Sequence, residues 1–214
     1  MSAVADLKLK VCGMRDPENI LAVAALKPDY MGFIFYPDSP RDVSYTFAVP
    51  SNFPSSIKKV GVFVQDGVDT IMRQSEKLAL DYIQLHGAND SVQFCQELAS
   101  LNVKIIKVFS VDDAFDFEVT KPYKDVVDFF LFDTKGKLRG GNGTTFDWRV
   151  LERYDQEVPF LLSGGLNPEN VTNLSLLKGM NIHALDINSG VERWPGNKDI
   201  EKIKSIQTII SNLK

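Results

Sequence analysis

The feature that most constrains this chain is a regular alternation of short apolar runs with helix-like segments. Eight runs rich in β-branched and aromatic residues end 22 to 30 residues apart. They cover residues 8–12, 30–35, 59–64, 82–86, 104–109, 128–133, 159–163 and 183–187. Runs of this length that are closed by Gly, Pro, Asp or Ser are typical of strands. The sequence therefore predicts eight strands at a nearly even spacing.

The segments between these runs carry helix signals. Asp16 is a residue typical of N-caps, and Pro17 stands at a first helical turn, where no backbone amide is needed. Helices are expected over residues 17–26, 90–101, 168–177 (after Asn167 as a cap) and 199–213. In segment 44–56, Pro50 and Pro54 break any long helix, so this crossover is expected to be mostly irregular.

Eight strands that alternate with helical segments indicate a parallel sheet with right-handed crossovers. Such units can close into an α/β barrel, the (β/α)8 TIM barrel, and an open doubly wound sheet is the alternative. At 214 residues the chain is expected to form a single domain over residues 1–214, a barrel with few insertions. In this fold the chemistry lies at the carboxyl ends of the strands.

Composition narrows the class of function. With 44% apolar and 24% charged residues and a net charge of −4, the chain is globular and has no electrostatic footprint for nucleic acid or an anionic membrane. No apolar stretch approaches the roughly 18 to 20 residues that cross a bilayer. Cys12 and Cys95 in a chain with no charged-then-apolar leader predict no disulfide and a cytoplasmic location, with Cys95 in the core.

Two glycine turns follow the seventh and eighth predicted strands. They are Gly164-Gly165 and Ser189-Gly190, and backbone amides in these two loops commonly bind phosphate in such barrels. The pattern predicts a small phosphate ester as substrate. The alternative is that these glycines only permit tight turns between strand and helix.

Two candidates for proton transfer stand at strand ends. Cys12, followed by Gly13, is a candidate base, although a free cysteine is most often a small buried hydrophobe. Asp133 leaves an apolar strand, where desolvation favours the protonated carboxyl that a general acid needs. Its alternative role is a helix cap.

Two further residues are candidates for substrate contact. Arg41 offers a planar fork that suits a carboxylate, or it is a solvated loop arginine. His86 either positions substrate or is satisfied by loop backbone, and its spacing to Cys12 and Cys95 gives no metal pattern.

Taken in order, the motifs resemble those of the phosphoribosylanthranilate isomerase family over nearly the whole chain. They are KVCG at 10–13, GFIFYP at 32–37, SPR at 39–41, VGVFV at 60–64, QLHG at 84–87, FDT at 132–134, GGNG at 140–143, FDW at 146–148, LSGGLNPEN at 162–170, DINSGVE at 186–192, PG at 195–196 and KD at 198–199. Asn142 and Asn188 stand where the family more often has Thr or Ser.

The resemblance implies a ribulose-phosphate-binding barrel that works without cofactor or metal in tryptophan biosynthesis. It implies an Amadori rearrangement in which Asp133 is the acid that opens the sugar ring and Cys12 the base that removes the C2 proton. It also implies that Arg41 holds the anthranilate carboxylate, that the glycine turns hold the phosphate, and that Asp186 and His86 orient the sugar.

Two alternative functions and one alternative oligomeric state remain from the sequence. A related phosphosugar isomerase or lyase, such as an indole-glycerol-phosphate synthase relative or a histidine-pathway Amadori isomerase, relies on lysine or paired aspartates where this chain has Cys12. A non-catalytic phosphosugar-binding barrel would not need both Cys12 and Asp133. A monomer is expected, with a homodimer as the alternative.

Overall fold

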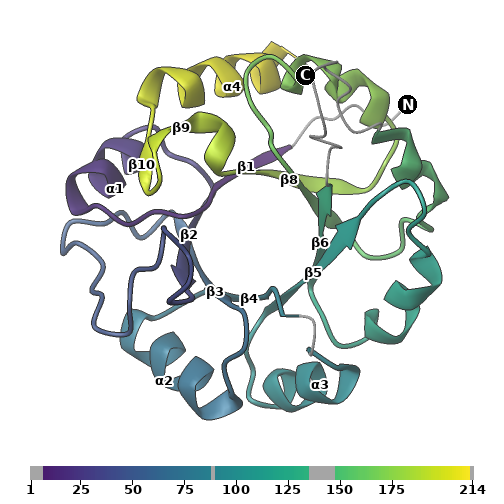
Figure 1. Ribbon diagram of the computed structural model, residues 1–214, viewed down its shortest axis with the longest axis horizontal. Coiled ribbons are helices and arrows are strands. Elements are labelled where there is room, and N and C mark those ends of the chain that lie inside the picture. The colour runs from purple at the N-terminus through teal and green to yellow at the C-terminus, as the bar shows by residue number, and fades with distance from the viewer. Residues whose placement is uncertain (1–6, 88–89, 135–147, 213–214) are drawn as a thin grey trace.

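The computed structural model describes residues 7–87, 90–134 and 148–212. Eight parallel strands follow one another in chain order around a closed barrel (Figure 1). They are β1 (Lys8–Val11), β2 (Tyr30–Phe35), β3 (Lys58–Phe63), β4 (Tyr82–Leu85), β5 (Ile105–Val111), β6 (Phe129–Thr134), β7 (Phe160–Ser163) and β8 (Ile182–Ile187). The predicted barrel is confirmed, and the open sheet is wrong because β1 pairs with β8 from Lys8 opposite Ala184 to Val11 opposite Ile187.

Helical segments surround the barrel (Figure 1). They are the α-helices α1 (Pro17–Ala24), α2 (Val68–Leu78), α3 (Val92–Ser100) and α4 (Ile200–Asn212), and the 3₁₀ segments η1 (Phe117–Tyr123), η2 (Trp148–Arg153), η3 (Val171–Leu177) and η4 (Ser189–Val191). The connection between β2 and β3 contains turns and no helix, as Pro50 and Pro54 predict. Pro17 opens α1, but the Asp16 side chain does not cap it, because that carboxylate accepts a hydrogen bond from Arg15 Nε instead.

The predicted α-helix over 168–177 is wrong in type, since only a 3₁₀ segment forms there. Asn167 Oδ1 accepts from the backbone amides of Glu169 and Asn170, and Asn170 Oδ1 accepts from the amide of Asn167. Asparagine side chains that hydrogen-bond to nearby backbone compete with the backbone hydrogen bonds of a helix. Here they occupy the backbone amides of what would be the first helical turn.

A short hairpin, which no local pattern in the sequence predicts, follows β8. Here β9 (Glu192–Trp194) pairs antiparallel with β10 (Asn197–Lys198), and the hairpin lies beside α1 (Figure 1). Gly196 turns it at φ +87°, against the Arg15 guanidinium. The hairpin places two charged side chains beside the loop after β1, as described below.

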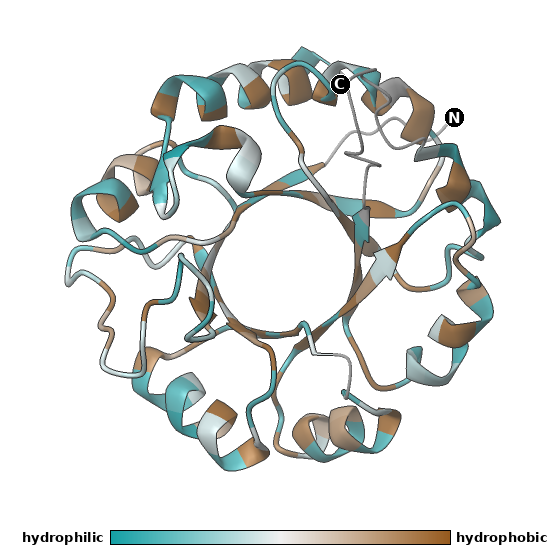
Figure 2. Cartoon of the chain, in the orientation of Figure 1, coloured by the Kyte–Doolittle hydropathy of each residue, from teal (hydrophilic) through white to brown (hydrophobic). Residues whose placement is uncertain are grey.

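The core has two parts. Apolar side chains between the strands and the helices form the larger cluster, and the helices turn apolar residues toward the barrel (Figure 2). A smaller apolar cluster fills the barrel interior; it consists of Tyr30, Val60, Ile106, Val108, Leu131, Leu161 and Ala184. Because side chains alternate along a strand, residues two positions after these also face inward, nearer the carboxyl ends. Polar side chains stand there, which makes this end chemically distinct.

Among residues 7–87, 90–134 and 148–212, no helix is both long enough and apolar enough to cross a membrane.

Candidate active site

A pocket opens at the carboxyl ends of the strands. It is lined by Cys12, Ile34, Val62, Gln84, His86, Leu131, Asp133, Ser163, Gly164, Gly165, Asp186, Asn188 and Ser189. The alternation of strand residues explains its polar members, since Asp133 lies two positions after Leu131 and Asp186 two positions after Ala184. The structure thus brings together seven of the nine residues expected to form the site.

Cys12 lies directly after β1, and its side chain is 4% exposed. The Cys12 amide donates to the carbonyl of Ile187 across the β1–β8 seam at 2.9 Å. A Cβ on Gly32 of β2 would come within 2.7 Å of Cys12 Sγ. Glycine at position 32 therefore leaves the room that the thiol occupies, a role that the sequence analysis did not assign to it.

Lys10 is the main polar residue that the sequence analysis overlooked. Its side chain is wholly buried, and its Nζ donates to Asp186 Oδ1 at 2.8 Å, where β1 and β8 place the two residues side by side. Lys10 lies two positions before Cys12 and faces the same way. The signal was present in the sequence as a lysine inside an otherwise apolar strand.

This buried ammonium sets the electrostatics around the thiol. Burial raises the pKa of Cys12, and the charges of Lys10 and Lys198 act in the opposite direction. Burial also works to lower the pKa of Lys10, but attraction to Asp186 and Cys12 outweighs it, so the pKa of Lys10 is raised. A permanent positive charge therefore stands beside a thiol that is protonated at neutral pH.

Asp133 ends on the pocket wall near His86. Its carboxylate Oδ2 lies 4.0 Å from His86 Nε2, and the two side chains are 27% and 40% exposed. Burial lowers the pKa of His86, against the attraction of Asp133, so the imidazole is neutral at pH 7. A neutral imidazole can both donate and accept a hydrogen bond, which suits a residue that contacts sugar hydroxyls.

The two glycine turns differ in role. Gly164 and Gly165 adopt φ of +109° and +64°, and they line the pocket together with Ser189. Gly190 is not among the residues that line the pocket. A Cβ at this position would stand 2.0 Å from the carbonyl oxygen of Leu166. Gly190 lets the loop after β8 pass close over the loop after β7, and so brings the two turns together.

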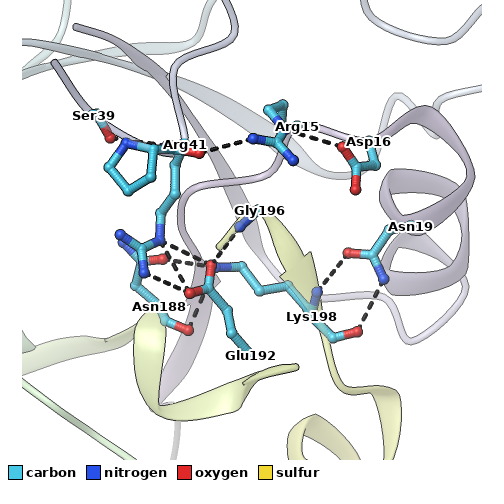
Figure 3. Close-up of polar contacts among 10 residues, drawn as sticks. Arg15, Asp16, Asn19, Ser39, Arg41, Asn188, Glu192, Gly196 and Lys198 are labelled. Carbon is cyan, nitrogen blue, oxygen red and sulfur yellow. Dashed lines mark hydrogen bonds and ion pairs between the residues drawn. The ribbon is translucent and has the colours of Figure 1, made fainter. Parts of the chain in front are cut away.

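Arg41 lies beside the pocket rather than in its wall. The loop after β2 places it over Gly13, where a Cβ would lie 2.7 Å from Arg41 Cδ and 2.6 Å from Asn188 Oδ1. Its guanidinium forms a double hydrogen bond with Glu192 (Figure 3). The sequence analysis predicted neither Glu192 nor Asn188 as part of this region.

Gln84, part of the QLHG motif at a strand end, is a further candidate to which the sequence assigned no role. Its side chain is 2% exposed on β4 and lines the pocket, and Oε1 has no hydrogen-bond partner in the described part of the chain. A buried amide oxygen without a hydrogen-bond partner is unfavourable, so Gln84 Oε1 favours a ligand that donates a hydrogen bond to it. A glutamine two residues before His86 in an apolar strand was the available signal.

The remaining predictions concern metals and cysteines. Within the three described ranges, no group of three or more His, Cys, Asp or Glu could hold a metal ion. Cys12 and Cys95 are both free thiols, and Cys95 is buried on α3. The GGNG motif at 140–143 and Asn142 lie outside the described residues.

Comparison with known proteins places this geometry in a family. The model of the family described as N-(5'phosphoribosyl)anthranilate (PRA) isomerase matches residues 9–208. The N-(5'-phosphoribosyl)anthranilate isomerase of Parabacteroides distasonis is 44% identical over 94% of this chain and 93% of its own. That of Phocaeicola vulgatus is 40% identical over 96% of this chain and 97% of its own.

Solved structures agree. A phosphoribosyl anthranilate isomerase in complex with reduced 1-(o-carboxyphenylamino)-1-deoxyribulose 5-phosphate is 31% identical, with a TM-score of 0.80 over 96% of this chain and 99% of that one. The enzyme from Thermotoga maritima is 32% identical, with a TM-score of 0.78 over 96% of this chain and 99% of that one. With this fold, this pocket and these relatives, the chain belongs to the N-(5'-phosphoribosyl)anthranilate isomerase family.

Proposed function

We propose that this chain converts N-(5'-phosphoribosyl)anthranilate to 1-(2-carboxyphenylamino)-1-deoxyribulose 5-phosphate, a step of tryptophan biosynthesis. The observation that carries the proposal is that Cys12 and Asp133 line one pocket, from strands on different sides of the barrel. An isomerisation that both donates and removes a proton needs two groups with access to one substrate. The single barrel domain carries the whole reaction.

Asp133 is the general acid of the first step. Its protonated carboxyl donates a proton to the furanose ring oxygen, and the C1–O bond breaks with its electron pair going to that oxygen. The nitrogen lone pair forms a C=N bond, which gives an open-chain Schiff base with a free C4 hydroxyl. At 27% exposure the carboxyl can exchange protons with water between turnovers.

Cys12 is the general base of the second step. The Cys12 thiol first loses its proton to solvent, and the resulting thiolate takes the C2 proton. The C2–H electrons form a C1=C2 bond while the iminium bond shifts its electrons to nitrogen. The resulting enolamine becomes the ketone when C1 gains a proton and the C2 hydroxyl loses one. Lys10 favours the thiolate by its charge, since it is held within the barrel wall by Asp186.

The other predicted residues bind the phosphosugar. Amides of the turns at Gly164, Gly165 and Ser189 hold the phosphate, with Gly190 fixing the approach of the two loops. Asp186 and His86 orient the sugar, and Arg41 receives the anthranilate carboxylate. No cofactor or metal takes part, and the protein acts as a monomer in the cytoplasm.

The proposal is tested by turnover of the purified protein. Phosphoribosylanthranilate is generated in situ, a metal chelator is added, and the loss of anthranilate fluorescence is followed. Loss of fluorescence that yields the ribulose product supports the proposal. Absence of turnover together with tight binding of the product would overturn it in favour of a non-catalytic barrel, and absence of both would indicate another phosphosugar.

A further inference from the structure

Two residues of the β9–β10 hairpin hold Arg41 in a fixed direction. Arg41 Nε donates to Glu192 Oε1 at 2.9 Å, and Arg41 Nη2 donates to Glu192 Oε2 at 2.5 Å (Figure 3). Lys198 Nζ donates to the same Oε1 at 2.7 Å, and the Gly196 amide also donates to it at 2.9 Å. The carboxylate of Glu192 is therefore held by residues of its own hairpin as well as by Arg41.

This pairing occupies only one edge of the guanidinium. Arg41 has five N–H donors, and Glu192 takes the side formed by Nε and Nη2. The outer edge, formed by Nη1 and the second Nη2 hydrogen, has no partner among the described residues. An outer edge of this geometry matches a planar carboxylate.

Arg41, Glu192, Lys198 and Asn188 form a cluster that contains two basic side chains but only one acidic side chain. Lys198 is fully buried, and its Nζ donates to Glu192 Oε1 and to both oxygens of Asn188. Burial lowers the pKa of Lys198, and its hydrogen bond and ion pair with Glu192 act in the opposite direction. Burial works to raise the pKa of Glu192, but hydrogen bonds from Arg41 and Lys198 lower it below its ordinary value. Two cations thus share one ionised carboxylate, and a second carboxylate would balance them.

The position of the cluster relates this charge to the pocket. Lys198 holds Asn188, which lines the pocket, and the Arg41 stem and Asn188 both lie over Gly13, next to Cys12. The side chains of Arg41 and Glu192 are 19% and 6% exposed, so the attraction is weakly screened. An anion that entered here would meet a rigid, partly desolvated donor.

We propose that Glu192 and Lys198 are positioning residues that fix the outer edge of Arg41 and supply the surplus positive charge, and so make the enzyme selective for a substrate that carries a carboxylate on its aromatic ring. The inference rests on the proposed function, because it assumes that Arg41 receives the anthranilate carboxylate. Glu192 fixes the orientation of the Arg41 guanidinium, and Lys198 supplies the second positive charge that leaves the Arg41–Glu192–Lys198 group with a net charge of +1.

The test compares two substrates. The selectivity ratio is kcat/KM for N-(5'-phosphoribosyl)anthranilate divided by kcat/KM for N-(5'-phosphoribosyl)aniline, which lacks the carboxylate. Arg41→Ala should lower this ratio on the order of 100-fold, since it removes a charge-assisted double hydrogen bond. Glu192→Gln and Lys198→Met should each lower it by about tenfold or more, mainly through KM for the anthranilate substrate.

Three further variants sharpen the result. Glu192→Asp keeps the charge but shortens the side chain. Its selectivity ratio should therefore lie between those of the wild type and Glu192→Gln, and it provides a second reading if Glu192→Gln folds poorly. Glu192→Gln added to Arg41→Ala should cause no further loss of selectivity. Asp155→Asn is the control. Asp155 precedes β7, so it lies at the end of the barrel opposite the pocket, where it forms an ion pair with Lys124. Loss of this ion pair should leave the selectivity ratio unchanged.

The outcomes separate the two proposals. If Arg41→Ala lowers the ratio but Glu192→Gln and Lys198→Met keep it, the positioning role is wrong and the proposed function stands. If Arg41→Ala itself keeps the ratio, the carboxylate contact is wrong and the inference with it. If the wild type turns over neither substrate, the proposed function fails.

Discussion

At the scale of single residues, the unusual feature is a lysine placed inside the barrel wall. Lys10 lies in an apolar strand and binds Asp186, which is 176 positions away in the sequence. A buried charge is costly unless it is paired, and the two partners meet only because β1 and β8 close the barrel. The closure of the fold therefore supplies the charge that favours deprotonation of Cys12.

The pair predicts the outcome of Lys10→Met. The variant would leave Asp186 buried without its Lys10 partner. Its free energy of unfolding, measured by urea denaturation, should therefore be about 3–5 kcal/mol smaller. The pKa of Cys12 should rise further, because the charge that lowers it is lost. Thiolate absorbance at 240 nm, taken as the difference from Lys10→Met/Cys12→Ser, reports that pKa.

Replacing both partners provides the control. Lys10→Met/Asp186→Leu leaves no unpaired charge and should recover most of the lost stability, while the thiol still lacks its neighbouring cation. A Cys12 pKa in Lys10→Met equal to that of the parent protein would contradict the assignment.

Candidate residues were predictable to different degrees. Cys12, Asp133, His86 and Asp186 stand at strand ends, which can be recognised from local patterns, and all four line the pocket. Glu192 could not be predicted as a partner of Arg41, because 151 positions separate them and nothing local marks the contact. Pairing of this kind depends on the closed barrel.

At the scale of elements, the two loops after β7 and β8 work as a unit. Gly165 needs its left-handed backbone, but a Cβ there would meet no atom within 4 Å. Gly190 does not have a left-handed backbone but stands where no side chain fits. Glycine is thus required at position 165 for its backbone conformation and at position 190 for its small size. Sequence reasoning found both turns but could not tell these demands apart.

This difference predicts unequal effects of the same substitution. Gly165→Ala should lower the free energy of unfolding by about 1 kcal/mol, the cost of a left-handed alanine. Gly190→Ala should cost more, about 2–3 kcal/mol, because its Cβ meets the Leu166 carbonyl and the backbone must shift. Gly190→Ala should also weaken binding of inorganic phosphate. Urea unfolding and phosphate titration check both, and equal costs would contradict the packing role.

The elements show where local patterns suffice. Strand boundaries agree with expectation within two residues because strand length and composition carry that information. The hairpin of β9 and β10 and the 3₁₀ form of η3 were not foreseen. Both depend on side-chain bonds, those of Glu192 to Gly196 and those of Asn167 and Asn170, that compete with the regular pattern.

At the scale of the whole molecule, the barrel buries its apolar residues between strands and helices and keeps its polar interior at one end. The large hydrophobic residues that remain exposed in the described ranges lie on separate elements; they are Tyr45, Leu101, Val119, Leu176 and Trp194. These five are the large exposed apolar side chains of the described residues, and a stable interface usually needs a contiguous apolar patch. The phosphoribosylanthranilate isomerase of Thermotoga maritima is dimeric.

The distribution predicts a monomer in solution. Light scattering after size exclusion should give a mass near 24.0 kDa that does not change with protein concentration. Trp194→Lys, which alters the most exposed of these residues at 55%, serves as the control and should leave the mass unchanged. A mass of twice this value that falls to the monomer in Trp194→Lys would place an interface at the β9–β10 hairpin.

The assignment of Cys12 as base and Asp133 as acid is tested most directly by the turnover rates of Cys12→Ser and Asp133→Asn on substrate deuterated at C2. Each variant should lose at least about 100-fold in kcat while still binding the product, since each lacks one proton-transfer group. In the residual activity, Cys12→Ser should show a large isotope effect because C2–H cleavage limits it, and Asp133→Asn a small one because ring opening does. Turnover near that of the parent protein in either variant would contradict the assignment of base and acid.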